Sequence, residues 1–249
     1  EFAGHLKLTK LIVLWDDNSI SIDGNTNLAN SSNQIARFKA SGWHTQSVDG
    51  HDFDQISKAI ENARKTNKPS FIACKTIIGF GSPNLAGTEK THGAPLGDDE
   101  VKKVKEELNW KSNPFEVPKD ILSNWRASVE RGLEIRKEWE DRFNKSPKKN
   151  KFIKNNSNYL SQVFDKNLKS HIQKLKLEKP KLATRQASLE FLKVLSSNVD
   201  NIAGGSADLT GSNLTKTPDM NSLKPKKFKA NYIHYGIREH MMGAVMNGI

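Results

Sequence analysis

The sequence is poor in cysteine, with one residue of this type, Cys74, among its 249 residues. A single cysteine excludes a disulfide within the chain and a metal site built from several cysteines. Cys74 lies in the apolar stretch 71–74, which favours a packed strand position over a catalytic nucleophile. We therefore expect a reducing, cytoplasmic environment.

Long hydrophobic runs are also missing. No apolar stretch approaches the roughly 20 residues that a membrane-spanning helix needs, and no segment has the pattern of a secretory signal. The chain has no internal repeat and no glycine-rich nucleotide-binding or Walker motif. It starts at Glu1 without a methionine and stops within an apolar helical pattern at 246–249, so we expect an internal piece of a longer protein.

Acidic residues are fewer than basic ones, 28 against 39, which gives a net charge of +11. Such an excess attracts nucleic acid, anionic lipid or phosphorylated metabolites. Much of it falls in two lysine-rich runs, 145–154 and 224–229, and neither matches a nucleic-acid-binding motif. We interpret both runs as solvated charge and expect neither a nucleic-acid nor a membrane partner.

Strands and helices alternate in the first third of the chain. The apolar run 11–15 has the composition of a buried parallel strand and ends at two aspartates and an asparagine. The later elements are helices at 34–41 and 53–66 and strands at 45–48 and 70–78. This alternation predicts an α/β fold with parallel sheets flanked by helices.

A candidate metal site follows the first strand. Ligands of open α/β sheets bind beyond the carboxyl ends of the strands. Asn18 offers a side-chain oxygen there and Ile20 a backbone carbonyl, which suits a magnesium ion that also holds a phosphate. The alternative is an Asx turn after the strand, with a second turn closed by 23–24. Local sequence leaves both interpretations open.

A long loop at 79–97 contains five glycines and two prolines. Loops of this length inside a compact domain usually carry function. His92 is its one side chain with a titration range suited to catalysis. The alternative is a loop histidine bonded to the backbone.

The rest of the chain is predicted to contain two long helical stretches and a second α/β pattern. Helices are expected at 98–108 and 118–143, and the polar segment 144–158 is the best boundary candidate. A core-facing apolar stripe follows, formed by Leu160, Phe164, Leu168, Ile172 and Leu175. The second pattern has a helix at 184–195, a strand at 199–203, a glycine- and hydroxyl-rich loop at 204–213, and a helix starting near Glu239. A carboxylate at a helix start also has a purely structural explanation, since it complements the helix dipole.

Eight short stretches together resemble one family. They are Ala-Gly-His-Leu-Lys-Leu (3–8), Asp-Asp-Asn-Ser-Ile-Ser-Ile-Asp-Gly (16–24), Asp-Gly-His-Asp (49–52), Cys-Lys-Thr-Ile-Ile-Gly-Phe-Gly-Ser-Pro-Asn (74–84), Thr-His-Gly-Ala-Pro-Leu-Gly (91–97), Ala-Thr-Arg-Gln-Ala-Ser (183–188), Gly-Gly-Ser-Ala-Asp-Leu (204–209) and Gly-Ile-Arg-Glu-His-Met-Met (236–242). In this order, and spread over nearly the whole chain, they resemble the transketolases, thiamine diphosphate enzymes of sugar-phosphate metabolism.

The resemblance implies the thiamine-diphosphate-binding fold, present as two partial domains. Residues 1–150 would be the later part of the diphosphate-binding domain with a helical extension. Residues 151–180 would be a linker and entry helix, and 181–249 the start of the pyrimidine-binding domain. In this family the cofactor lies between subunits, so a homodimer is implied.

The resemblance also implies roles for the cofactor-binding residues. Asn18 and the Ile20 carbonyl would ligate Mg²⁺, or Ca²⁺ or Mn²⁺, together with an aspartate that precedes Glu1. Ile22 would pack against the cofactor rings, and Asp208 would contact the cofactor. Glu239 would bond to a pyrimidine nitrogen and start the proton relay that activates the cofactor.

Substrate-binding roles follow in the same way. His92 would reach the cofactor diphosphate and the hydroxyls of the donor sugar, and would assist proton transfer. Arg185 and Ser212 match positions that bind the substrate phosphate, and a guanidinium fork fits phosphate geometry.

The activity implied is transketolase activity in the pentose phosphate pathway, the transfer of a two-carbon ketol unit from a ketose phosphate to an aldose phosphate. One alternative is a dihydroxyacetone synthase, which uses formaldehyde as acceptor. Another is a non-catalytic relative that binds sugar phosphates, although such a binder needs no proton relay. We expect the 249-residue stretch to be inactive alone.

Overall fold

The computed structural model describes residues 1–157 and 162–249. Its contacts divide the chain into two compact units, Glu1–Arg126 and Ala127–Ile249. The domain boundary near residue 150 stays a prediction.

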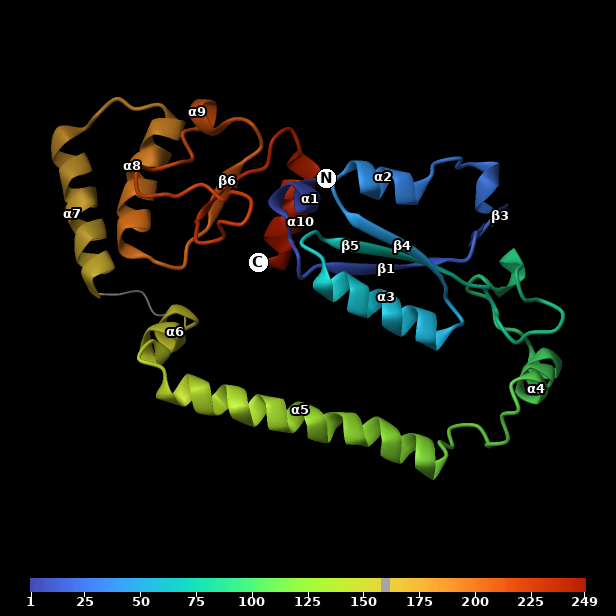
Figure 1. Ribbon diagram of the computed structural model, residues 1–249. Helices are drawn as coiled ribbons and strands as arrows, with labels where there is room; N and C mark the ends of the chain where they lie inside the picture. Colours follow the sequence, from blue (N-terminus) through green and yellow to red (C-terminus); the bar gives the residue numbers. More distant parts are fainter. Residues whose placement is uncertain (158–161) are drawn as a thin grey trace. The chain divides into compact units, whose positions relative to one another are not determined.

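The first unit is built on a parallel three-stranded sheet with the order β1-β5-β4 (Figure 1). These strands are β1 (Ile12–Asp17), β5 (Ser70–Lys75) and β4 (His44–Asp49). The expected parallel α/β sheet is therefore confirmed. The strand predicted at 70–78 ends earlier, at Lys75, and the Ile77 backbone N–H donates to the His51 side chain instead of to a neighbouring strand.

The central strand β5 is buried on both faces, since successive side chains of a strand point to opposite sides. Ile72 and Cys74 pack against the alanines of α3 (Phe53–Lys65). On the other face Phe71 stacks on Phe38 of α2 (Gln34–Ala40), with 3.9 Å between ring centroids. Figure 1 shows α2 and α3 on opposite sides of the sheet.

Cys74 occupies the packed strand position that the sequence predicts. Burial, and secondarily the charge of Asp16, raises the pKa of the Cys74 thiol. The neutral thiol is a poor nucleophile, so Cys74 has a structural role.

Short elements surround the sheet. Helix α1 (Phe2–Leu6) precedes β1, and a small hairpin of β2 (Ile20–Ser21) and β3 (Gly24–Asn25) follows it. After β5 come the long loop, which includes the 3₁₀ turn η2 (Glu89–Thr91), and helix α4 (Asp98–Glu107). The helix predicted at 98–108 is thus confirmed.

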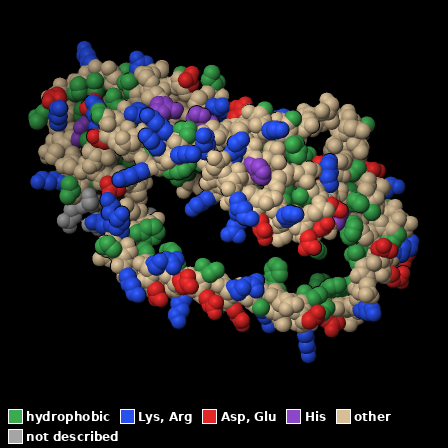
Figure 2. Space-filling view, in the orientation of Figure 1, with side chains coloured by type: hydrophobic (Ala, Val, Ile, Leu, Met, Phe, Trp, Pro, Cys, Tyr) green, Lys and Arg blue, Asp and Glu red, His purple; other side chains and the backbone are tan. Residues whose placement is uncertain are grey.

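Helix α5 (Lys119–Lys145) is the longest in the described part of the chain, and it confirms the helix predicted at 118–143. Basic and acidic side chains are interspersed along it (Figure 2), and one pair joins Arg136 to Glu140 at 2.8 Å. Several large apolar side chains of α5 are exposed, namely Trp125, Val129, Leu133, Ile135 and Trp139.

The polar segment 144–158, the best boundary candidate in the sequence, contains a helix that the sequence did not predict, α6 (Lys149–Asn155). Phe152 of α6 meets Phe143 at the end of α5 edge to face, with 5.5 Å between ring centroids. Lys151 forms an ion pair with Asp200. An aromatic contact and an ion pair therefore stabilise a helix that the lysine-rich composition does not predict.

The second unit contains a helix pair, α7 (Gln162–Glu178) and α8 (Thr184–Asn198), which pack on each other. Phe164 of the predicted apolar stripe is buried, whereas Ile172 is 42% exposed. Leu160 lies outside the described residues.

Two short parallel strands, β6 (Gly204–Ser206) and β7 (Tyr232–His234), complete this unit with α9 (Thr210–Asn213) and α10 (Glu239–Gly248). The strand predicted at 199–203 is wrong, because the pairing starts at Gly204. A Cβ atom on Gly205 would lie 2.6 Å from the carbonyl oxygen of Ile233, so the close approach of the two strands requires glycine there.

Across residues 1–157 and 162–249, no helix combines the length and the apolar character needed to cross a membrane.

Shortening the fully buried Ile72 tests the importance of β5. We expect Ile72→Ala to lower the free energy of unfolding by about 2–5 kcal/mol, because it leaves a cavity between β5 and α3. Chemical denaturation measures this loss. The control Leu28→Ala, at a side chain 72% exposed, should leave stability nearly unchanged; equal losses would contradict the assignment of the core.

Candidate functional site

A cavity of about 450 Å³ lies at the carboxyl edge of the first unit's sheet. It is lined from all three strands, by residues that include Asp17, Ser47 and Lys75. The register places the last residues of β1 and β4 on either side of Lys75. Asn18 and Ile20 also line this cavity, so both predicted metal-binding residues reach the edge where α/β sheets bind ligands.

The chain turns sharply where it enters this cavity. The side-chain oxygen of Asn18 accepts a hydrogen bond from the Ile20 backbone N–H at 3.0 Å, and Ser19 between them has a φ of 63°. The Asx turn that the sequence offered as an alternative is therefore present. It does not exclude ion binding, because an amide oxygen has a second lone pair.

Carboxylates near the turn already have partners. Asp17 is buried and forms an ion pair with Lys75, and Asp16 accepts a hydrogen bond from the Thr76 hydroxyl. The oxygens at the end of the turn, those of Asn18 and the Ile20 backbone, carry no formal charge. Such a donor set fits a magnesium ion that takes its other ligands from a phosphate.

The described residues contain no group of three or more His, Cys, Asp or Glu side chains that could hold a metal ion. Ile22 lies between the two strands of the small hairpin and is 73% exposed. Its apolar surface is thus available to a ligand.

His92 follows η2 in the loop 79–97 and is exposed. Its backbone N–H donates to the Glu89 carbonyl at 2.9 Å. The predicted catalytic histidine is therefore held by its backbone while its imidazole faces solvent.

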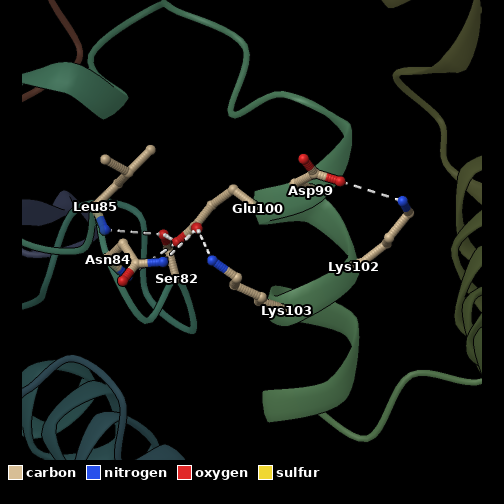
Figure 3. A network of polar contacts seen from close by, with 7 residues as sticks. All are labelled: Ser82, Asn84, Leu85, Asp99, Glu100, Lys102 and Lys103. Atoms are coloured by element: carbon tan, nitrogen blue, oxygen red, sulfur yellow. Dashed lines mark hydrogen bonds and ion pairs between the residues drawn. The ribbon is translucent and has the colours of Figure 1, made fainter.

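Glu100 was missed by sequence reasoning, although it anchors this loop (Figure 3). Its carboxylate is 8% exposed and accepts hydrogen bonds from the Ser82 hydroxyl at 2.5 Å, the Asn84 amide side chain at 2.8 Å and the Asn84 backbone N–H at 2.9 Å. The Ser82 hydroxyl first, and then Asn84, lower the pKa of Glu100 to about 2. The sequence signal was three acidic residues directly after the loop, which also suit a helix start.

His51 was also missed, although its motif was noted. Its Nε2 accepts a hydrogen bond from the Ile77 backbone N–H at 2.9 Å, and its ring stacks on Phe80 with centroids 4.0 Å apart. These contacts fix the first residues that leave β5.

The second unit contributes a segment that follows β6. Asp208 has a φ of 62°, and both it and Ser212 are exposed. The fully buried Tyr232 donates a hydrogen bond to the Thr210 hydroxyl at 2.9 Å and lies 2.7 Å from the Thr215 hydroxyl. The structure thus places Asp208 and Ser212 on one segment that Tyr232 holds in position.

Arg185 and Glu239 lie on two different helices of the second unit. Arg185 is in the first turn of α8, and Glu239 is the first residue of α10; both are exposed. Just before Glu239, the Arg238 side chain donates to the Tyr235 carbonyl at 3.0 Å and fixes the start of α10.

Comparison with family models matches two successive stretches of the chain to one family. Residues 1–165 match the transketolase thiamine diphosphate binding domain, and residues 180–249 match the transketolase pyrimidine binding domain.

Individual relatives agree. The transketolase of Sinorhizobium medicae is 47% identical over 100% of this chain and 36% of its own length. The transketolase of Pichia stipitis, solved in complex with sedoheptulose-7-phosphate, superposes with a TM-score of 0.89 at 38% identity over 100% of this chain and 38% of that one. The transketolase from Leishmania mexicana gives a TM-score of 0.89 at 33% identity over 99% of this chain and 37% of that one.

This chain therefore spans somewhat more than a third of the length of these relatives. The two family models match most of it, one after the other. Its parallel sheet, its edge cavity and these matches lead to one conclusion: the chain belongs to the transketolase family.

Proposed function

We propose that this chain acts within a transketolase, which transfers a two-carbon ketol unit from a ketose phosphate to an aldose phosphate in the pentose phosphate pathway. The observation that supports this most is the cavity at the carboxyl edge of the sheet. Asn18 and Ile20 line it, within the segment that matches the family's thiamine diphosphate binding domain.

In this proposal Asn18 and the Ile20 carbonyl hold Mg²⁺, or Ca²⁺ or Mn²⁺, against the diphosphate of the cofactor. The ion pair between Lys75 and Asp17 keeps this edge of the sheet from accumulating negative charge, which would repel a diphosphate. The exposed Ile22 provides apolar contact to the cofactor rings.

Thiamine diphosphate, when bound, supplies the chemistry that carries the two-carbon unit. Glu239 holds a proton at the pyrimidine nitrogen of the cofactor, and Asp208 contacts the cofactor. A carboxyl group shares a proton more readily when it is shielded from water. Glu239 is exposed in the single chain, so the proposal includes a homodimer whose second subunit covers it.

The substrate is held by other side chains of the chain. His92 moves a proton at a hydroxyl of the donor sugar, and Arg185 and Ser212 bind the phosphate at the other end. The proposed substrate class is supported by the Pichia stipitis transketolase, which was solved with a sugar phosphate. The cytoplasmic location expected from the sequence stays a prediction.

The role of Glu239 is tested by replacing its side chain with that of alanine in the full-length protein. We expect Glu239→Ala to lower kcat at least about 100-fold, the usual scale for removing an acid–base group, while circular dichroism shows an intact fold. Glu130→Ala, at an exposed carboxylate of α5, is the matched control and should keep full activity. Near-normal turnover of Glu239→Ala would remove this residue from the proton relay.

Arg185 is tested by comparing two donors. We expect Arg185→Ala to raise KM for a phosphorylated ketose about 10–100-fold, since a hydrogen bond to a charged group contributes about 1.5–3 kcal/mol. The KM for hydroxypyruvate, which has no phosphate, should change little. Arg185→Lys should lie between, because it keeps the charge and loses the planar fork. Equal changes for both donors would show that Arg185 does not bind the phosphate.

A further inference from the structure

We propose that Glu100 is a positioning residue that holds His92 in place through the loop 79–97; this inference rests on the role of His92 in the proposed function. Glu100 lies on α4, after the loop, and its carboxylate reaches back to Ser82 and Asn84 near the loop's start. It therefore closes a ring of chain that contains His92.

The carboxylate suits this task because it accepts from three donors at once. Ser82 contributes a hydroxyl, and Asn84 contributes both its backbone N–H and its side-chain amide. Lys103 on the same helix lies 3.8 Å from the second carboxylate oxygen. A carboxylate has about four acceptor positions and no donor, whereas a glutamine would turn an N–H₂ group toward one of these donors.

From Ser82 a ladder of hydrogen bonds in steps of three residues runs to His92. The Ser82 hydroxyl accepts from the Leu85 backbone N–H at 3.2 Å. The Leu85 carbonyl accepts from the Thr88 hydroxyl at 2.7 Å, and the Thr88 carbonyl accepts from the Thr91 hydroxyl at 2.9 Å. His92 is the next residue, so a defined series of hydrogen bonds connects the Glu100 anchor to the backbone of His92.

The far end of the ladder rests on the start of the loop. Gly79 has a φ of 65°, and a Cβ atom on it would lie 2.7 Å from the Thr91 methyl carbon. The Gly87 backbone N–H donates to the Ile78 carbonyl at 2.8 Å. The ladder thus packs against the segment that leaves β5, and this contact fixes the position of the backbone at His92.

The charge on Glu100 is permanent under working conditions. The Ser82 and Asn84 hydrogen bonds lower its pKa to about 2, so the carboxylate is ionised at neutral pH and the anchor does not act as a pH switch. The neighbouring Asp99 differs: its side chain is 93% exposed and pairs with Lys102 at 3.2 Å (Figure 3). The chain therefore offers a matched control one residue away.

Acid unfolding tests the anchor itself. A carboxyl whose pKa is lowered by folding stabilises the protein above its ordinary pKa of 4.5, and this stabilisation is lost as the pH falls toward about 2. The urea midpoint of Glu100→Gln should therefore lie below that of the wild type at pH 7, and the gap should narrow below about pH 4.5. Asp99→Asn should show no comparable gap. A gap for Glu100→Gln that is constant with pH would overturn the charged anchor.

A double-mutant cycle in the full-length protein tests the link to His92. With thiamine diphosphate and Mg²⁺ saturating, we expect Glu100→Gln to lower kcat/KM for the donor about 10–100-fold, the scale of a small misplacement of a catalytic group. In the His92→Ala background the same change should cost less than about twofold, because the group that it positions is gone. Asp99→Asn should have no effect in either background.

Each other outcome counts against the proposal. Equal losses with and without His92 would mean that Glu100 acts on the fold in general, while the role of His92 would stand. If His92→Ala alone leaves kcat/KM unchanged, both the proposed role of His92 and this inference fail. If Glu100→Gln does not fold, Ser82→Ala replaces it, since it removes the 2.5 Å contact to Glu100 and the first step of the ladder and leaves the contacts of Asn84. The loss of kcat/KM that Ser82→Ala causes must also shrink in the His92→Ala background.

Discussion

Burial of β5 on both faces is the constraint on which the candidate site depends. The strand packs between two neighbours and between two helices, so its register cannot shift without moving apolar side chains out of both cores. That register aligns Asp17 and Asp49 with Lys75, and three strands therefore end at one edge. The cavity lined by Asn18 and Ile20 is a consequence of this alignment rather than a separate feature.

Polar contacts then fix the segments that leave the sheet. Lys75 neutralises Asp17, His51 holds the backbone at Ile77, and Glu100 draws the start of the long loop onto α4. In the second unit Tyr232 has a similar task for the segment of Asp208 and Ser212. The side chains of Ile22, His92, Arg185, Asp208, Ser212 and Glu239, which are proposed to touch ligands, are exposed, whereas Asn18 is half-buried, and the holding residues Glu100 and Tyr232 are buried.

Much of this arrangement could be predicted from the sequence, because it is local or periodic. The apolar run before Asn18 predicts a strand, although β1 lies at the edge of the sheet and is only partly buried, and the helix over 98–108 follows from its spacing of apolar residues. The failures have physical reasons. The strand at Gly204 depends on a close approach to β7, and one contact of α6, the ion pair of Lys151 with Asp200, joins residues that are distant in sequence. Glu100 was missed because its partners come from the other end of a loop.

The ladder of hydrogen bonds from Ser82 to Thr91 has a consequence for how the loop can vary in length. Its steps are three residues apart, and each joins a side-chain hydroxyl to a backbone N–H or carbonyl group. Substitutions between the steps leave the ladder intact. One added or deleted residue, in contrast, would bring the wrong side chain to every later step. Apart from Asn84, which binds Glu100, and Gly87, whose φ is 75°, the positions between the steps can therefore differ in composition, while the length of the loop is fixed by the path to His92.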